Sequence, residues 1–227
     1  MTPSMVKAFR DSWKRKTEIV KLGRNGYVVA IVAIALVTLG GAAYLFRIPP
    51  FSEKKGEINA SAVCQSLGSA SKATTVLTSV LAEASSYAFD DEVHLRGDDD
   101  DSYRSHCFVS GDGDQLMSVT SEMMRDEPLE DWVESEVAES AGQQRLSPFL
   151  GDVKSAASES VAAIFMPCVS PGNIPGGQYN ISVVVHLKNA KNVSSTDRQN
   201  SLIELAKGAA AYAHDKGKCN APSELSA

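Results

Sequence analysis

The sequence predicts an α+β protein: a single N-terminal transmembrane helix followed by a two-layer α/β sandwich with a mainly antiparallel sheet and two disulfides. Three observations predict this fold class. A run of twenty residues without charge lies near the N-terminus, at 27–46, and all four cysteines follow it. The rest of the chain alternates helical and strand-like hydrophobic patterns, in the order helices, hairpin, helix, hairpin, helix.

The chain of 227 residues is long enough for an anchor and one domain of ordinary size. We expect a basic cytoplasmic tail at 1–26, a transmembrane helix at 27–46, a linker at 47–57, an extracytoplasmic domain at 58–220 and a C-terminal tail at 221–227. Net charge changes from +7 over residues 1–55 (ten Lys/Arg, three Asp/Glu) to −13 over the remainder (twelve against twenty-five). Phosphate backbones repel an acidic domain, so we expect no nucleic acid among its partners.

The uncharged run at 27–46 has the length of a membrane span. At about 1.5 Å per residue it makes a helix of about 30 Å, the thickness of a bilayer's hydrocarbon core. Tyr27 and Tyr44 lie near its ends, where aromatic rings favour the interface. Pro49 and Pro50 follow where the helix should stop. The lipid bilayer is therefore an expected partner of this chain.

The basic residues around the run predict its orientation. Seven precede it: Lys7, Arg10, Lys14, Arg15, Lys16, Lys21 and Arg24. Fewer follow it closely, so the positive-inside rule keeps the N-terminus cytoplasmic and places the C-terminal domain outside the cell membrane. The alternative is a cleaved signal peptide, because small residues of the kind that cleavage requires stand at 40–43. The length of the apolar run favours an uncleaved signal-anchor, since signal-peptide cores span about 7–15 residues.

The cysteines agree with that topology. Cys64, Cys107, Cys168 and Cys219 all lie in the part expected outside the cytoplasm. An even number of cysteines there is typical of a disulfide framework in an oxidising compartment. Their spacing contains no Cys-x-x-Cys pair and no His–Cys cluster, so we expect no metal site. Four cysteines allow three pairings, which spacing alone does not separate.

The first half of the domain is expected to contain two helices and a hairpin. In order, we expect a helix capped by Asn59 or Ser61 that carries Cys64 and breaks at Gly68, a helix at 71–84, an extended segment at 87–95, an acidic loop at 97–101, and strands at 103–110 and 115–123. The turn between the two strands is Gly111-Asp112-Gly113-Asp114, and its Asp-Gly pair is a hairpin signal.

The second half repeats part of this pattern. Pro128 opens an amphipathic helix, and strands are expected at 161–169 and 181–187. A final helix begins with a capping box at 196–199 and ends at Gly217. Its expected buried face consists of Leu202, Leu205, Ala206, Ala209, Tyr212 and Ala213.

This layout favours one of the three cysteine pairings. Each half of the domain has one cysteine on or beside a helix and one on a hairpin strand. Helix-to-sheet pairing within each half joins Cys64 to Cys107 and Cys168 to Cys219. In the chain-entropy model each such bridge contributes about 4 kcal/mol of stability.

Catalytic motifs are nearly absent from the sequence. Ser69-Ala-Ser71-Lys72 fits Ser-x-x-Lys, in which a helical lysine activates a serine, but the partner motifs of that class are missing downstream. The same pattern occurs at 4–7, inside the basic tail, which shows how easily it arises. No Gly-x-Ser-x-Gly, P-loop or dinucleotide fingerprint occurs. We therefore expect no catalytic residue, no cofactor and no enzymatic activity.

Acidic and imidazole side chains do not follow a metal pattern either. The acidic run at 98–101, with Asp112 and Asp114, suggests calcium, but Leu116 occupies the third ligand position of a loop that starts at Asp112. A solvated acidic loop is the better interpretation. The histidines, scattered without metal spacing, are His94, His106, His186 and His214. His106 and His186 lie in predicted strands, and we expect them to be partly buried and hydrogen-bonded.

The early Cys64 helix, the strands "CFVSGDG" and "MPCVSPG", and the late alanine-rich helix closing on Cys219 carry a resemblance. The chain resembles uncharacterised actinobacterial (Streptomyces-like) single-pass envelope proteins with a four-cysteine extracytoplasmic domain. The resemblance covers most of residues 57–220. It implies a location and a fold, and that class has no established activity to transfer.

These observations favour a non-enzymatic function. We expect a membrane-anchored extracytoplasmic binding or interaction domain of the cell envelope, which docks another envelope protein or acts within a membrane complex. The alternative is a wall-active or periplasmic hydrolase whose site is assembled from residues distant in sequence. An exposed apolar patch favours the binding domain, and a polar cleft favours the hydrolase.

The topology is testable by protease shaving of intact cells or protoplasts, followed by peptide mapping without reductant. We expect release of fragments beyond about residue 52 with both disulfides intact, because the domain is predicted to face an oxidising compartment. A domain that resists shaving and carries four free thiols would reverse the predicted orientation.

Overall fold

The computed structural model describes residues 55–151, 153–223 and 225, together with Ile34 and Thr38. The predicted span at 27–46 lies outside the described residues except for those two, which are helical. Thr38 donates its hydroxyl hydrogen to the Ile34 carbonyl at 3.0 Å. Among the described residues, no helix combines the length and the apolarity needed to cross a bilayer. All other described residues fall in one unit of the chain, Lys54–Ala227.

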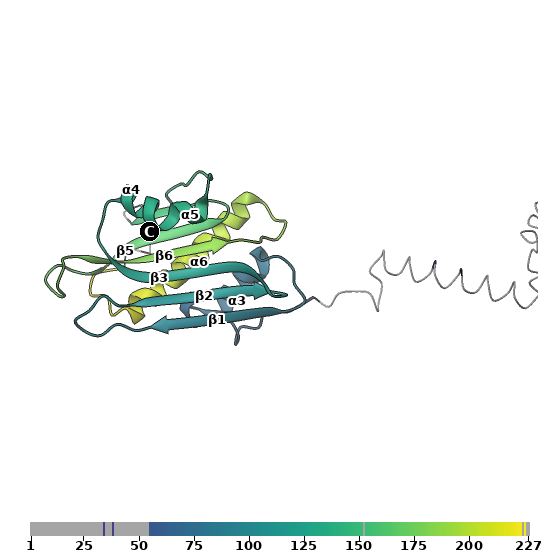
Figure 1. The fold of residues 1–227 in the computed structure, drawn as a ribbon, viewed down its shortest axis with the longest axis horizontal. Coiled ribbons are helices and arrows are strands. Elements are labelled where there is room, and N and C mark those ends of the chain that lie inside the picture. Colours follow the sequence, from purple (N-terminus) through teal and green to yellow (C-terminus); the bar gives the residue numbers. More distant parts are fainter. Residues whose placement is uncertain (1–33, 35–37, 39–54, 152, 224, 226–227) are drawn as a thin grey trace, which may run out of the picture. The chain divides into compact units, whose positions relative to one another are not determined.

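A six-stranded antiparallel sheet forms the centre of this unit (Figure 1). Its strands are β1 (Tyr87–His94), β2 (Arg104–Gly111), β3 (Asp114–Arg125), β4 (Lys154–Ala157), β5 (Val161–Val169) and β6 (Tyr179–Leu187). Their order is β1-β2-β3-β6-β5-β4, so two three-stranded meanders meet at the β3–β6 pair. The α+β class, the antiparallel sheet and both hairpins are confirmed. The short strand β4 is an addition that the sequence does not predict.

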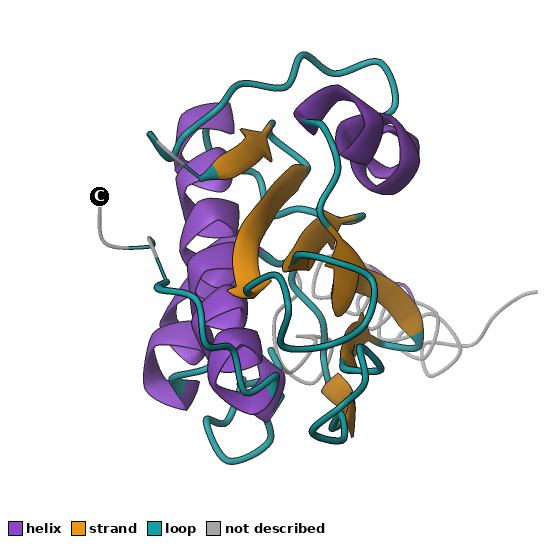
Figure 2. Cartoon of the chain, turned by 90° about the vertical axis from the view of Figure 1, so that its left-hand side faces the viewer, coloured by secondary structure: helices purple, strands orange, loops and turns teal. Residues whose placement is uncertain are grey.

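The helices α3 (Ala70–Val80) and α6 (Ser195–Lys216) lie on one face of the sheet (Figure 2). They enclose the main core together with inward-facing side chains of β2, β3, β5 and β6. The buried face of α6 consists of Leu202, Leu205, Ala206, Ala209, Ala210 and Ala213. Five of these six are predicted by the sequence, whereas Tyr212 is half-buried at the edge of that face.

The segment before α3 differs from the predicted helix, because only Gln65–Leu67 form a single 3-10 turn, η1. Asp91 on β1 explains the difference. Its carboxylate accepts hydrogen bonds from the Gln65 N–H at 2.7 Å and from the Ser66 hydroxyl at 2.5 Å. The donors at the start of the turn are therefore satisfied by a strand residue, and no longer helix is needed to pair them.

Helix α3 ends at Val80, earlier than predicted. Leu81 is extended and forms an isolated bridge with Ala190. The backbone N–H of Lys191 also bonds to the Val80 carbonyl at 2.8 Å. The last turn thus gives its hydrogen-bonding groups to the segment after β6 instead of to a further helical turn.

Helix α6 is capped by a different pair of residues than predicted. The Ser194 hydroxyl accepts a hydrogen bond from the Asp197 N–H at 3.1 Å and donates one to the Asp197 carboxylate at 2.6 Å. This pair replaces the predicted capping box at 196–199 and satisfies one free N–H of the first turn, that of Asp197. The helix ends directly before Gly217, as predicted.

The helical segment that Pro128 opens lies on the opposite face of the sheet (Figures 1 and 2). It consists of α4 (Leu129–Trp132), the π-helical turn η2 (Val133–Val137) and α5 (Ala138–Ala141). The buried Trp132 indole stacks on Phe165 with 5.1 Å between ring centroids and donates to the Ser182 hydroxyl at 2.9 Å. The expected two-layer sandwich is therefore corrected to three layers over β5 and β6.

Both disulfides join a helical element to the sheet, and the predicted pairing is confirmed. Cys64, before η1, bonds to Cys107 on β2, and Cys168 on β5 bonds to Cys219 after α6. The paired cysteines are separated by 43 and 51 residues. Each bridge is worth about 4 kcal/mol in the chain-entropy model. No cysteine of the described part of the chain is free.

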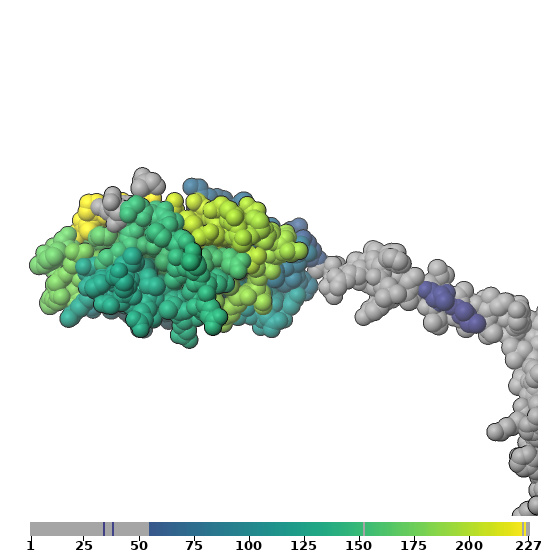
Figure 3. Space-filling view, turned by 90° about the horizontal axis from the view of Figure 1, so that it is seen from above, coloured from purple at the N-terminus to yellow at the C-terminus, as the bar shows by residue number. Residues whose placement is uncertain are grey.

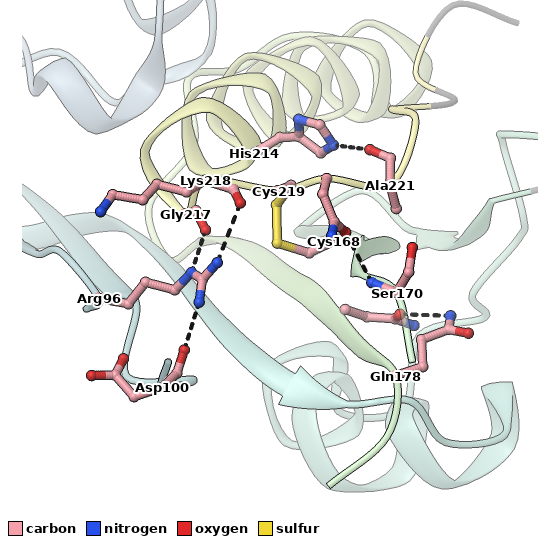
Figure 4. Close-up of a disulfide and its surroundings, with 12 residues drawn as sticks. Arg96, Asp100, Cys168, Ser170, Gln178, His214, Gly217, Lys218, Cys219 and Ala221 are labelled. Atoms are coloured by element: carbon pink, nitrogen blue, oxygen red, sulfur yellow. Dashed lines mark hydrogen bonds between the residues drawn. A yellow bond between two sulfur atoms is a disulfide. The ribbon is translucent and has the colours of Figure 1, made fainter. Parts of the chain in front are cut away.

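Beside the second disulfide, Arg96 ties the C-terminal end of α6 to the loop after β1 (Figure 4). Its guanidinium donates to the carbonyls of Gly217 and Lys218 at 2.6 and 3.3 Å. It also donates to the carbonyls of Asp98 and Asp100 at 3.2 and 2.8 Å. Because the side chain is buried, its charge is stabilised by backbone carbonyls at the negative end of the α6 dipole.

Replacing Arg96 by methionine tests this connection. Arg96→Met removes four hydrogen bonds of a buried charged group and leaves their carbonyls without a donor, so we expect a loss of about 2–4 kcal/mol in the free energy of unfolding. Urea denaturation measures it. The matched Arg145→Met, at an exposed loop position, should change stability by no more than about 0.5 kcal/mol. Equal urea midpoints for the two variants would contradict the role of Arg96.

Candidate functional site

Ser69 and Lys72, the ends of the Ser-x-x-Lys motif, are not joined in the structure. Ser69 is the N-cap residue of α3, and its Oγ lies 3.3 Å from Oγ of Ser71. Within the described ranges, no hydrogen bond links Ser69 to Lys72. Activation of a serine by a base requires heavy-atom distances of about 2.6–3.2 Å. The motif therefore forms no assembled nucleophile here.

The acidic residues that suggested calcium contact neighbouring groups of the chain. Asp112, in the β2–β3 turn, accepts hydrogen bonds from the N–H groups of Ser85 and Ser86 at 2.9 and 3.1 Å. Hydrogen bonds from Ser85, followed by those from Ser86, hold the pKa of Asp112 below 3.8. Asp98 pairs with Lys218 at 2.6 Å, which lowers its pKa as well. Among the described residues, no three His, Cys, Asp or Glu side chains are grouped to hold a metal ion.

Three histidines come to one face of the sheet. His94, His106 and His186 lie on β1, β2 and β6, at positions whose side chains point away from α6. His106 and His186 are half-buried, as predicted, but neither makes a side-chain hydrogen bond to another described residue. Burial, with a smaller contribution from the charge of Lys188, lowers the pKa of His186. The ring of His214, on α6, lies 2.9 Å from a backbone carbonyl near the C-terminus.

The same face of β1, β2 and β3 is left uncovered by the helices, because α4 and α5 lie over the other half of the sheet (Figures 1 and 2). We call this surface the open face. Side chains alternate along each strand, so the face is made of every second residue. Its members are Asp90, Glu92 and His94 of β1, Arg104, His106 and Phe108 of β2, and Ser118, Thr120 and Glu122 of β3.

Phe108 stands in the middle of the open face. Its side chain is 42% exposed, and it opposes Asp90 on β1 and Ser118 on β3. The ring of His106 is parallel to it, with 6.2 Å between centroids and 4° between planes. An exposed aromatic ring surrounded by polar groups is typical of a contact surface.

Carboxylates surround Phe108 on this face. Asp90 and Glu92 lie on β1, Glu122 lies on β3, and Glu136 of η2 lies beside Glu122 at the border with the covered half. Burial raises the pKa of Glu136 above 4.5, and the charge of Glu122 raises it further. Glu136 therefore holds a proton more readily than an isolated exposed glutamate does. The open face as a whole therefore favours the binding of cationic groups.

The two edges of the sheet are poorly suited to the addition of a strand from another chain. Strand β1, at one edge, carries Asp90, Asp91 and Glu92 in succession, and like charges oppose the addition of a second copy of this strand. At the other edge, the backbone of Ser147 exchanges two hydrogen bonds of 2.9 Å with Ala157 of β4. Viewed from above, the green segment with α4 and α5 and the yellow-green α6 fill this side (Figure 3).

No family model matches this chain, and neither a curated protein nor a solved structure matches it. Inferences about the function of its surfaces therefore come from the structure alone. The resemblance to actinobacterial single-pass envelope proteins stays a prediction.

Sequence reasoning treated the histidines as scattered and missed Phe108. Alternation in the predicted strands indicates which residues share a face, and it places His106 with Phe108. It does not indicate that the helix after Pro128 covers β5, β6 and only the Met124 end of β3. That contact depends on Trp132 reaching Ser182, which lies fifty residues later.

The pairing of Glu122 with Glu136 makes a prediction about pH. When folding raises the pKa of a carboxyl group, the group stabilises the fold fully at pH values below its pKa in the unfolded chain, about 4.5 for glutamate. That stability is lost as the pH rises through the pKa of the group in the folded protein. Glu136→Gln removes this loss. We expect a variant that is more stable than the parent near pH 7, by less than about 1 kcal/mol after solvent screening, and equal to it near pH 4.

Urea midpoints measured between about pH 4 and pH 7 check this expectation. The matched variant Glu139→Gln changes an exposed carboxylate on the next helical turn, and it should follow the parent at every pH. A Glu136→Gln variant that is less stable than the parent near pH 7 would contradict the assignment.

Proposed function

We propose that this protein is a membrane-anchored extracytoplasmic binding domain of the cell envelope, and that it docks a partner protein on its open face. One observation carries the proposal. A helical segment covers the second face of the sheet over β5, β6 and the Met124 end of β3, and the uncovered part presents an exposed aromatic ring at its centre. Buried aromatic anchors at the centre of an interface commonly supply most of its binding energy.

The anchoring part of the proposal is supported by the sequence and by the cysteines. A basic tail precedes a twenty-residue uncharged run, and every cysteine follows that run. Ile34 and Thr38, the described residues of the run, are helical, and the Thr38 hydroxyl bonds one turn back, as hydroxyl groups do in apolar helices. Two disulfides are typical of an oxidising compartment.

The charge of the open face indicates the chemistry of the partner. Carboxylates of β1, β3 and η2 flank Phe108, and Arg104 is the basic side chain among the residues that define the face. Complementary charge speeds association and selects partners. We therefore infer that the docked surface presents cationic groups around an apolar or aromatic residue.

Site-specific photo-crosslinking in intact cells tests the proposal. A benzoylphenylalanine at position 108 should give a light-dependent adduct with one envelope protein, because the native side chain is already an exposed ring. The same residue at Asn200, exposed on α6 across the sheet, should not give that adduct. Added Asp90→Lys should weaken the adduct at least about tenfold, since it places a cation opposite the ring, and Glu204→Lys should leave it unchanged.

The proposal is wrong if position 108 yields only the uncrosslinked monomer under varied growth conditions. An adduct that forms equally at position 200 would also contradict it, because proximity in the membrane would then explain both products.

A further inference from the structure

A groove of about 850 Å³ runs between α3 and α6. Its floor is formed by Leu67 and Leu205, which are both 2% exposed. Its volume falls in the range of about 300–1,000 Å³ that is typical of small-molecule sites. The groove shares no residue with the open face.

The groove exists because small residues line α6 at this point. A Cβ atom on Gly208 would lie 2.6 Å from the Leu67 carbonyl oxygen, and one on Gly68 would lie 2.8 Å from the Gly208 carbonyl oxygen. The two backbones therefore touch directly. Ala211, one turn of α6 further on, is also too small to fill the space beside this crossing. The result is a hollow above the crossing whose lining is mainly apolar.

One end of the groove is formed by Tyr212. Its ring is half-buried, and its hydroxyl makes no hydrogen bond to another residue that the structure describes. Burial raises the pKa of Tyr212, and the charge of Asp91 raises it further. The phenol therefore stays protonated at neutral pH and is free to donate a hydrogen bond to a ligand.

The lysines of the groove are distinct from the other lysines of the domain. Those described are Lys55, Lys72, Lys154, Lys188, Lys191, Lys207, Lys216 and Lys218. Six of these eight make an ion pair or a side-chain hydrogen bond. The two that make none with any described residue are Lys72 and Lys207, and both line the groove.

This distribution is unexpected in an acidic domain. Residues 56–227 contain twenty-five carboxylates and twelve basic side chains, so most lysines can find a carboxylate nearby. Glu204 is the single carboxylate among the residues that line the groove. Two unpaired ammonium groups and a free phenol thus border an apolar hollow, which is the arrangement expected for a ligand with an anionic head and an apolar body.

We propose that the groove between α3 and α6 binds an anionic phospholipid. The lipid phosphate lies against Lys72 and Lys207, and an acyl chain lies over Leu67, Leu205 and the small residues of α6. This inference rests on the proposed membrane anchoring for the source of the lipid, which is the bilayer that holds the chain.

The length of the linker agrees with that source. The predicted span ends at residue 46 and the described domain begins at Lys55, so eight residues lie between them. Fully extended, they reach about 26–29 Å. Lys55 pairs with Glu83 just beyond the C-terminal end of α3, and the eleven residues of α3 measure about 16 Å. The linker is thus too short to hold the domain far from a bilayer that contains the predicted span.

The test uses the full-length chain in nanodiscs of zwitterionic phosphatidylcholine, at about 0.15 M salt to screen non-specific attraction. The probes are dihexanoyl phosphatidylglycerol, its phosphatidylcholine counterpart and glycerol 1-phosphate, titrated below their micellar concentrations and followed by chemical shifts of groove residues. We expect saturable binding of phosphatidylglycerol that is at least about tenfold tighter than binding of the other two probes.

Two double variants separate the groove from general charge. Lys72→Glu/Lys207→Glu should weaken phosphatidylglycerol binding at least about tenfold. Arg145→Glu/Lys188→Glu changes net charge equally at exposed positions outside the groove lining, and should leave binding unchanged. Ala211→Trp, which fills the hollow from an exposed position of α6, should abolish binding while the urea midpoint is kept.

The proposal is overturned if the two double variants bind phosphatidylglycerol equally, or if phosphatidylcholine binds as tightly. Equal affinity for glycerol 1-phosphate would reduce the groove to a phosphate site and would overturn the lipid assignment. Because the probes are soluble, lipid binding by a chain that protease shaving finds unanchored would uphold the groove and overturn the anchoring instead.

Discussion

The close packing of α6 on the sheet is the constraint on which the rest of the domain depends. Four of its six buried residues are alanines, so the helix backbone can approach the strands closely. Small side chains bury little apolar area, and the helix needs further attachment. The bond between Cys168 and Cys219 and the hydrogen bonds of Arg96 supply it at the C-terminal end (Figure 4). The same small-residue surface, through Gly208, admits the backbone of η1.

Packing on the two faces of the sheet follows different rules. The face toward α6 is filled along its length, whereas the opposite face is covered only where Trp132, Val137 and Ala141 pack on β5, β6 and Met124 of β3. The Trp132 indole is the largest of these buried side chains, and its hydrogen bond to Ser182 fixes its position. Antiparallel sheets commonly have one solvent-exposed face, so the uncovered strands need no further layer for stability. Exposed polar side chains would be enough to keep that face stable in water. The stability of the sheet therefore does not explain the exposed aromatic ring of Phe108.

The features that the sequence predicted are those set by neighbouring residues. Alternation and apolar runs predicted every strand except β4, and the Asp112-Gly113 turn predicted the hairpin. One cysteine per helix and per strand in each half favoured the observed pairing. The predicted helix around Cys64 was wrong because Asp91, from a later strand, satisfies its first donors. The groove could not be predicted either. Lys72 and Lys207 are 135 positions apart, and only the contact of Gly68 with Gly208 brings them to one hollow.

The open face and the groove lie on opposite sides of the sheet, with opposite electrostatic character. Charges that are separated by more than about 8–10 Å are largely screened at physiological salt, so acids on one side do little to weaken an anion site on the other. The separation also removes steric competition, because a lipid held by α3 and α6 leaves Phe108 free. A change in one site can reach the other only through β2 and β3, whose inward side chains contact the helical layer and whose outward side chains form the open face. A tightly packed core transmits such changes poorly unless it has a second stable arrangement. The two surfaces are therefore expected to bind their ligands independently, as two contacts of one anchored domain.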